Sequence, residues 1–190
     1  MKLIYIHGFG SCGKSNKYYT LKKLNIPLIA PNLPPSPKEA INMLDSIITP
    51  DSVLVGSSLG GYYAIYLAEK YFLKSILINP SLKPYKTLKN YIGLQYRFCD
   101  KKPFYWKKEY LKELKNLKTK PKRAKYLVLL QSGDEILNYK KTLKKFKNKP
   151  NARVIVEYGG NHRFENLEDY LSLIKNFITC LLYTSPSPRD

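Results

Sequence analysis

The sequence predicts an α/β fold, a three-layer sandwich in which a mostly parallel sheet carries helices on both faces and a short helical cap is added. Short apolar segments rich in branched side chains alternate with segments of helical periodicity, which is the pattern of parallel strands joined by helical crossovers. The chain of 190 residues is long enough for one sizeable core and short for two. In such a fold, functional residues gather at the carboxyl ends of the strands.

Each expected element has a local signal. Runs of branched or aromatic residues bounded by polar residues, glycine or proline predict strands at 3–6, 25–30, 52–55, 75–78, 126–130 and 152–158. Helical periodicity predicts helices at 15–24, 36–48, 59–72, 107–118, 138–148 and 165–178. The second helix is the best marked, because Ser36, Pro37 and Glu39 supply an N-cap, a first-turn proline and a capping-box carboxylate.

The stretch from Val53 to Ala64 contains the pattern G-x-S-x-G between an apolar run and helix-forming residues. This order predicts a strand, a sharp turn and a helix, with Ser58 in a strained backbone conformation above the end of the sheet. Gly56 and Gly60 would be needed because side chains there would collide with the neighbouring strand and helix. We therefore expect Ser58 to be a nucleophile, although the pattern alone also occurs in ordinary turns.

The first expected strand ends in His7-Gly8-Phe9-Gly10. In a serine hydrolase, a backbone N–H just after such a turn is one of two donors to the developing oxyanion, and the other belongs to the residue after the nucleophile. This assigns the oxyanion hole to Phe9 and Leu59. Gly10 is the alternative to Phe9, because the turn leaves the assignment uncertain by one residue.

The same turn offers a competing function. Residues 8–15 match G-x-x-x-x-G-K-[ST], the phosphate-binding P-loop, and they follow an expected strand as that motif requires. A nucleotide hydrolase using Lys14 and Ser15 would also need an acid for magnesium at the end of another strand. Asp134 follows the strand at 126–130 only after an intervening Ser-Gly, and the P-loop leaves the serine turn unexplained, so we favour the hydrolase over this alternative.

A carboxylate and a histidine follow the last two expected strands. Asp134 lies in the loop after 126–130, where the third member of a Ser-Asp-His triad belongs in this chain order, and Glu135 is the alternative. The chain has two histidines, and His7 belongs to the oxyanion turn. His162, on a Gly-Gly turn after the last strand, is therefore the candidate general base.

Residues 82–123 interrupt the alternation of strands and helices with an aromatic cluster and a basic helix. We expect a cap-like insertion over Ser58 whose aromatic side chains shape an acyl pocket; the alternative is a peripheral pair of helices that packs its own aromatic residues. We expect a single domain over 1–179. Residues 180–190 change character abruptly, and we exclude them from the fold as a non-native or disordered tail.

Composition limits the partners. The 33 basic and 14 acidic residues give a formal net charge of +19, which is compatible with an RNA-binding or membrane-surface module. A solvated lysine-rich surface explains the charge as well, and we expect no nucleic-acid partner.

No apolar run approaches a membrane span, and the apolar start is too short for a signal peptide, so we expect a cytoplasmic location. Cys12, Cys99 and Cys180 have no paired spacing and are expected to be reduced thiols.

Five motifs together resemble one family. They are Tyr5–Ser11, Gly56–Ala64, Ile78-Asn79-Pro80, Gly133-Asp134-Glu135 and Gly159-Gly160-Asn161-His162. In this order the chain resembles, over about 1–179, the small bacterial YqiA-like esterases of the α/β-hydrolase superfamily. The resemblance implies a carboxylic-ester hydrolase acting on small-molecule acyl esters, with thioesters left open, no metal and no cofactor. The Gly13-Lys14-Ser15 sequence and the high basicity depart from the family pattern.

Overall fold

The computed structural model describes residues 1–180. Its centre is a six-stranded sheet in the order β2-β1-β3-β4-β7-β8, in which every neighbouring pair is parallel. The strands are β1 (Lys2–Ile6), β2 (Leu28–Ile29), β3 (Ser52–Ser57), β4 (Lys74–Ile78), β7 (Lys125–Gln131) and β8 (Ala152–Glu157). The predicted parallel sheet is therefore confirmed.

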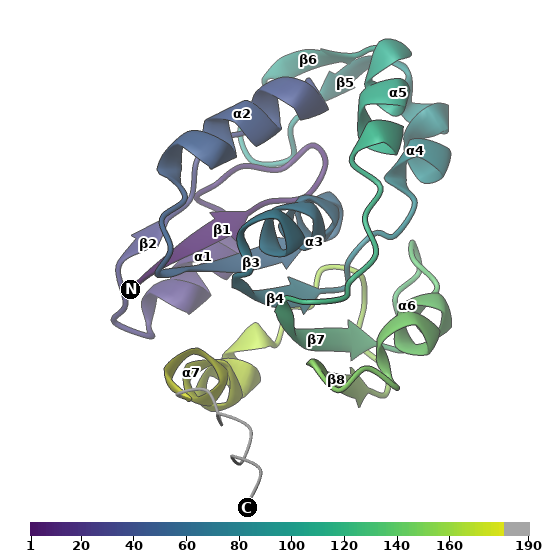
Figure 1. The fold of residues 1–190 in the computed structure, drawn as a ribbon. Coiled ribbons are helices and arrows are strands. Elements are labelled where there is room, and N and C mark those ends of the chain that lie inside the picture. Colours follow the sequence, from purple (N-terminus) through teal and green to yellow (C-terminus); the bar gives the residue numbers. More distant parts are fainter. Residues whose placement is uncertain (181–190) are drawn as a thin grey trace, which may run out of the picture.

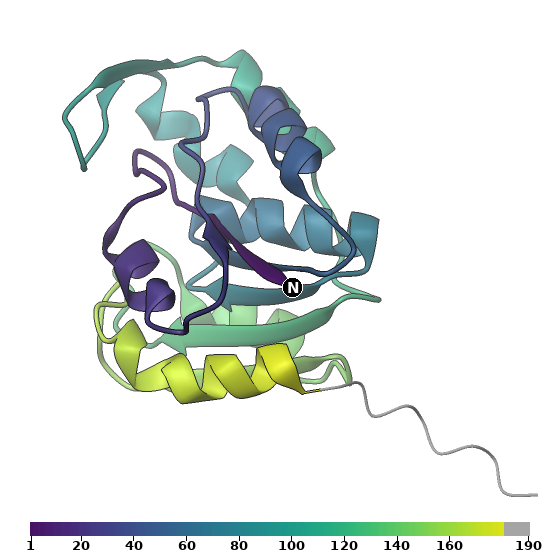
Figure 2. The same ribbon diagram turned by 90° about the vertical axis from the view of Figure 1, so that its left-hand side faces the viewer.

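Helices cover both faces of this sheet (Figures 1 and 2). One face carries α1 (Asn16–Lys22) and α7 (Leu171–Thr179), and α7 is at the lower left in Figure 1. The other face carries α2 (Pro37–Ile47), α3 (Leu59–Tyr71) and α6 (Tyr139–Phe146). The molecule therefore has the three predicted layers.

The strands supply one core on each side because successive side chains point to opposite faces. In β1, Leu3 and Tyr5 pack with the α1 and α7 side, whereas Ile4 and Ile6 pack with the α2 and α3 side. All four are buried. A strand buried on both faces has the near-continuous apolar sequence that predicted it.

The segment at 82–123 has more structure than the sequence predicted. It contains α4 (Pro84–Thr87), a 3₁₀ helix (Leu88–Tyr91), α5 (Glu109–Asn116) and an antiparallel hairpin of β5 (Gly93–Tyr96) and β6 (Pro103–Trp106). The expected short helical cap did not include this hairpin. The hairpin and α5 stand beside α2, above the sheet in Figure 1.

Two other expectations need correction. The strand expected at 25–30 shortens to Leu28–Ile29, because Asn25 has a φ of 55° and ends the turn after α1. The helix expected from 165 begins as a 3₁₀ helix at Leu167–Tyr170 and becomes α7 only at Leu171.

The cysteine prediction was wrong for two of the three residues. Cys12 and Cys99 form a disulfide, with Cα atoms 6.2 Å apart and a sequence separation of 87 residues. Their distance in the sequence gave no spacing signal, and they meet because the β5–β6 hairpin folds back over the loop after β1. Cys180 is a free, exposed cysteine.

Of the expected tail, residues 181–190 lie outside the described part. Among the described helices, none has the length and apolar character to cross a bilayer.

Candidate active site

Ser58 lies at the turn between β3 and α3, in an unusual backbone conformation. Its φ is 54° and its ψ is −117°, a region that non-glycine residues rarely adopt. Three backbone hydrogen bonds hold it there. Its N–H donates to the Ile78 carbonyl at 3.1 Å, and its carbonyl accepts from the N–H groups of Gly61 at 3.0 Å and Ser81 at 2.9 Å. The end of β4 and the loop after it therefore fix the serine above the sheet.

The two glycines of the motif allow this turn to pack tightly. A Cβ on Gly60 would collide with the carbonyl groups of Ile6 and His7, and a Cβ on Gly56 would collide with the backbone of Gly60. Strand β1 and helix α3 thus approach each other through positions that have no side chain. The collisions expected from the sequence are confirmed.

The structure brings Ser58, His162 and Asp134 together in one chain of hydrogen bonds. His162 Nε2 lies 3.0 Å from Ser58 Oγ, and His162 Nδ1 lies 2.8 Å from Asp134 Oδ2. A carboxylate can only accept, so Nδ1 carries the proton and Nε2 is free to accept from the serine hydroxyl. This is the geometry in which an imidazole can remove a proton from a serine.

Asp134 and Glu135 contact different parts of His162. The Asp134 side chain is 2% exposed. Its Oδ1 accepts from the N–H groups of Ile136 at 2.9 Å and Leu137 at 2.7 Å, which leaves Oδ2 for the imidazole. Glu135 is exposed and accepts from the backbone N–H of His162 at 2.9 Å. Hydrogen bonds from its own backbone N–H and that of His162 lower the pKa of the Glu135 carboxyl.

Two buried amides, to which sequence reasoning assigned no role, hold the loop that carries His162. Asn79 donates from Nδ2 to the carbonyls of Asn161 at 3.1 Å and His162 at 3.3 Å, and its Oδ1 accepts from the Gln131 N–H at 3.0 Å. Gln131 Oε1 accepts from the Asn161 N–H at 2.9 Å. Both amides are 2% exposed. The available signal was their position, since each is the first polar residue at the carboxyl end of a buried strand.

The expected oxyanion turn lies directly against the serine. A Cβ on Gly8 would lie 3.2 Å from the Ser58 Cβ. Within residues 1–180, neither Phe9 nor Gly10 has an acceptor for its backbone N–H, so both remain candidates. The Leu59 N–H opens α3 and has no partner within that helix. The Phe9 ring is fixed edge-on against Phe104 and Trp106 of β6, with centroids 5.5 and 5.0 Å apart.

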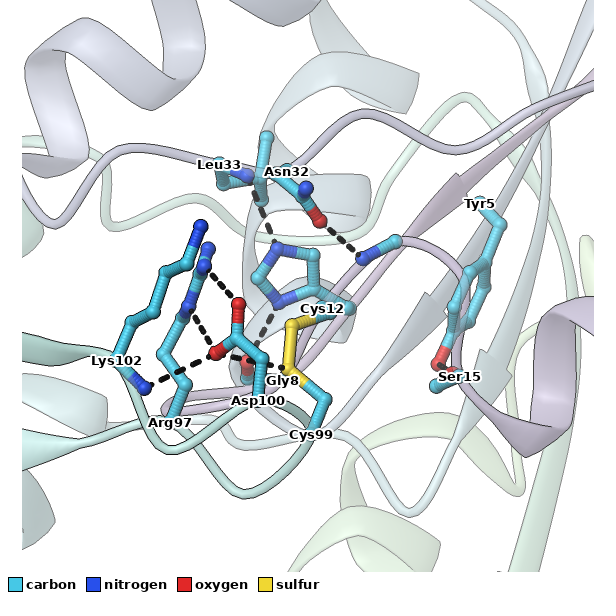
Figure 3. The surroundings of a disulfide bond; sticks show 12 residues. Tyr5, Gly8, Cys12, Ser15, Asn32, Leu33, Arg97, Cys99, Asp100 and Lys102 are labelled. Carbon is cyan, nitrogen blue, oxygen red and sulfur yellow. Dashed lines mark hydrogen bonds and ion pairs between the residues drawn. A yellow bond between two sulfur atoms is a disulfide. The ribbon is translucent and has the colours of Figure 1, made fainter.

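His7 fastens the oxyanion turn to the loop after β2. Its Nε2 accepts from the Leu33 N–H at 3.0 Å, so Nδ1 carries the proton and donates to the Gly8 carbonyl at 2.8 Å. The ring is 6% exposed, and burial lowers its pKa below the ordinary value. His7 is therefore a neutral side chain that shapes the turn. Figure 3 shows this network of Gly8, Asn32 and Leu33 next to the Cys12–Cys99 disulfide.

The P-loop pattern does not form a phosphate cradle. The Ser11 N–H donates to the Gly8 carbonyl at 3.2 Å, the Gly13 N–H to Asn32 Oδ1 at 2.9 Å and the Ser15 N–H to the Gly13 carbonyl at 2.9 Å. A phosphate-binding loop needs such N–H groups to point at the ligand. Here they are bonded within the protein.

The described part of the chain, residues 1–180, offers no metal site beside Ser58, His162 and Asp134. Within residues 1–180, the one grouping of three potential metal ligands is Cys12, Cys99 and Asp100. Both sulfurs are bonded to each other, which removes them as thiolate ligands.

Two hollows adjoin the turn at Gly8 and Phe9, and one of them reaches Ser58. The larger, which we call the Ser58 cleft, has a volume of about 950 Å³ and is lined by Ser58, His162 and several charged side chains. Burial, together with the Arg163 charge, lowers the pKa of Lys17 in this cleft to about 8.

The smaller hollow, which we call the Met43 cavity, has a volume of about 460 Å³ and lies between the oxyanion turn, α2, α3 and β6. Its walls are mostly apolar, formed by Phe9, Leu33, Met43, Leu59, Phe104 and Trp106.

Comparison with known proteins places this geometry in a family. A family model described as Uncharacterised protein family (UPF0227) matches residues 2–179. The chain belongs to this family. A UPF0227 relative, the protein YcfP of Escherichia coli O9:H4 (strain HS), is 26% identical over 191 residues, covering 93% of this chain and 98% of the relative. The predicted membership of the YqiA-like group is confirmed.

Solved structures show the same fold. The monoacylglycerol lipase of Paleococcus ferrophilus has a TM-score of 0.70 at 18% identity, with 93% of each chain covered. The mouse alpha/beta hydrolase domain-containing protein 10 has a TM-score of 0.68 at 18% identity, with 93% of this chain and 87% of that chain covered. The esterase domain of a Rhodothermus marinus protein has a TM-score of 0.64 at 17% identity, with 92% and 82% covered. The UPF0227 chain therefore has the α/β-hydrolase fold.

Proposed function

We propose that this UPF0227 protein is a serine hydrolase that cleaves carboxylic esters of small molecules through an acyl-enzyme on Ser58. The observation that carries the proposal is the chain of hydrogen bonds from Asp134 through His162 to Ser58, at 2.8 and 3.0 Å. The esterase and lipase among its structural neighbours support the same class of reaction.

The reaction has two halves. In the first, His162 Nε2 takes the Ser58 proton while Oγ attacks the ester carbonyl, and the N–H groups of Leu59 and Phe9, or Gly10, stabilise the oxyanion. Asp134 keeps the Nδ1–H tautomer and stabilises the imidazolium. His162 then returns the proton to the leaving alcohol. In the second half, His162 activates a water molecule that hydrolyses the acyl-enzyme.

The test is hydrolysis of p-nitrophenyl acetate and butyrate by the wild type and two serine variants. Ser58→Ala should lower kcat by about 10⁶-fold, because no nucleophile remains. Ser57→Ala is the matched control, since it removes the hydroxyl of the adjacent residue, and it should stay within about tenfold of the wild type. Labelling with a fluorophosphonate followed by peptide mapping should place the adduct on Ser58. Wild-type protein that cleaves no ester and takes no label would disprove the proposal.

The nucleotide alternative is tested on the same samples. Turnover of MgATP that Lys14→Ala abolishes would identify residues 8–15 as a nucleotide site. We expect no such turnover, because the N–H groups of Ser11, Gly13 and Ser15 are bonded within the protein. Lys14→Ala should retain hydrolysis of p-nitrophenyl acetate, because the hydrogen-bond chain from Asp134 through His162 to Ser58 does not include Lys14.

A further inference from the structure

The two hollows share one wall. Gly8, Phe9 and Ser11 line both the Ser58 cleft and the Met43 cavity, so the oxyanion turn separates them. Ser58 and His162 line the cleft, whereas Leu59, the residue after the nucleophile, lines the cavity. An ester bound at Ser58 therefore has two different places for its two halves.

The mechanism of ester cleavage determines which hollow binds the acyl half of the ester and which binds the alcohol half. This inference rests on the proposed function. The tetrahedral carbon of the intermediate carries four groups: Ser58 Oγ, the oxyanion, the leaving oxygen and the first carbon of the acyl chain. The leaving oxygen must receive its proton from His162 Nε2. Because His162 lines the cleft and not the cavity, the alcohol half must lie in the cleft.

The remaining substituent, the acyl chain, is directed to the other side of the oxyanion turn. Leu59 and Gly10 line only the Met43 cavity, whereas Phe9 lines both hollows, so an acyl chain that passes the donors to the oxyanion on this side enters the Met43 cavity. The Met43 cavity has a volume of about 460 Å³, within the range of small-molecule sites. The cavity is larger than an acetyl group, so a longer apolar acyl chain would make more contacts with its walls.

The cleft has more charged side chains than the cavity, whose charged lining residues are Arg97 and Lys102. Lys14, Lys17 and Arg163 line the cleft together with the carboxylates of Glu135 and Glu165. Burying an apolar alcohol among these charges would desolvate them without compensation, whereas hydroxyl groups could bond to them. We propose that the natural substrate is the ester of an apolar acyl group, bound in the Met43 cavity, with a polar alcohol, bound in the Ser58 cleft.

The acyl half is tested with Met43→Trp. Met43 is on α2 and is 38% exposed, so a larger side chain there can fill the cavity without entering the core. Wild-type kcat/KM should rise from p-nitrophenyl acetate to the octanoate, because added methylenes gain apolar contacts. In Met43→Trp, the octanoate-to-acetate ratio of kcat/KM should fall at least about tenfold.

The matched control is Asn42→Trp, which adds the same side chain one position away on α2. Asn42 is exposed and lines neither hollow, so the ratio should equal that of the wild type. An equal ratio in both tryptophan variants and the wild type would overturn the assignment of the acyl site. Absence of all ester hydrolysis in the wild type is a different outcome, because it refutes the proposed function itself.

The alcohol half is tested by comparing glycerol monooctanoate with hexyl octanoate in a pH-stat. Faster cleavage of the glycerol ester supports a polar alcohol site, and preference for the hexyl ester overturns it. Should Met43→Trp fail to fold, a crystal structure of the wild type with an octyl phosphonate on Ser58 decides the acyl site. The alkyl chain should lie beside Met43; a chain in the Ser58 cleft would contradict the proposal.

Discussion

The Glu135 carboxylate accepts a hydrogen bond from the backbone N–H of His162 at 2.9 Å, while the adjacent Asp134 bonds the imidazole of the same residue at 2.8 Å. Two consecutive acids therefore hold one histidine, one through its main chain and one through its ring. Only the bond to the ring can select a tautomer and stabilise an imidazolium. The sequence could not separate these roles, because both acids follow the same strand.

Asp134→Asn should lower kcat by about 10⁴-fold, because an amide at this position no longer fixes the Nδ1–H tautomer. Glu135→Gln should lower it by less than about tenfold, since the amide oxygen can still accept from the His162 N–H. Steady-state hydrolysis of p-nitrophenyl butyrate measures both variants. A larger loss in Glu135→Gln than in Asp134→Asn would reverse the assignment.

The sequence predicted most of the sheet because the four central strands, β1, β3, β4 and β7, are buried on both faces and have nearly continuous apolar sequences. The turn positions of Ser58 and His162 were predictable because glycines flank Ser58 and two glycines precede His162, and a glycine-containing turn at the end of a strand is a local signal. The contacts that depend on the path of 82–123 were not predictable. The β5–β6 hairpin exposes apolar side chains such as Tyr96 and Tyr105, so it lacks the buried apolar run that marks the strands of the sheet. The Cys12–Cys99 contact exists only once the hairpin has folded.

Ser58→Gly should be more stable than Ser58→Ala, although both lack the nucleophile. At a φ of 54° and a ψ of −117°, alanine retains the strain of a Cβ in a sparsely populated region, whereas glycine does not. We expect a difference of about 1–2 kcal/mol in the free energy of unfolding. Urea denaturation of the two variants measures it. Equal stability, or greater stability of the alanine variant, would show that the serine conformation carries no strain.

Reduction of the Cys12–Cys99 disulfide should destabilise the protein. The bond closes a loop with a sequence separation of 87 residues, and chain-entropy theory assigns about 4–5 kcal/mol to a loop of this length. It also ties the hairpin to the oxyanion turn, together with the Phe98 N–H, which donates to the Gly10 carbonyl at 2.7 Å. The urea midpoint of the wild type should therefore fall when a phosphine reductant is added.

Two variants control this measurement. Cys180→Ser removes the free cysteine and should keep the full response to the reductant. The double variant Cys12→Ser, Cys99→Ser should start at the lower midpoint and show no response. A wild type whose midpoint is the same with and without reductant would exclude a stabilising disulfide.

The stability of the fold should depend on pH through His7. Burial lowers the pKa of this side chain in the folded protein, whereas in the unfolded chain it titrates near about 6.5. Below that pH the unfolded chain binds a proton that the folded site resists, so the stabilising contribution is present above about pH 6.5 and is lost as the pH falls. One such proton changes the free energy of unfolding by at most about 1.4 kcal/mol per pH unit.

His7→Gln removes the titration but keeps an acceptor for the Leu33 N–H. Urea unfolding at pH 7.5 and 5.5 should therefore show a larger loss of stability in the wild type than in His7→Gln, since all other titrating groups are common to both. Equal losses in the two proteins would mean that His7 can be protonated within the fold.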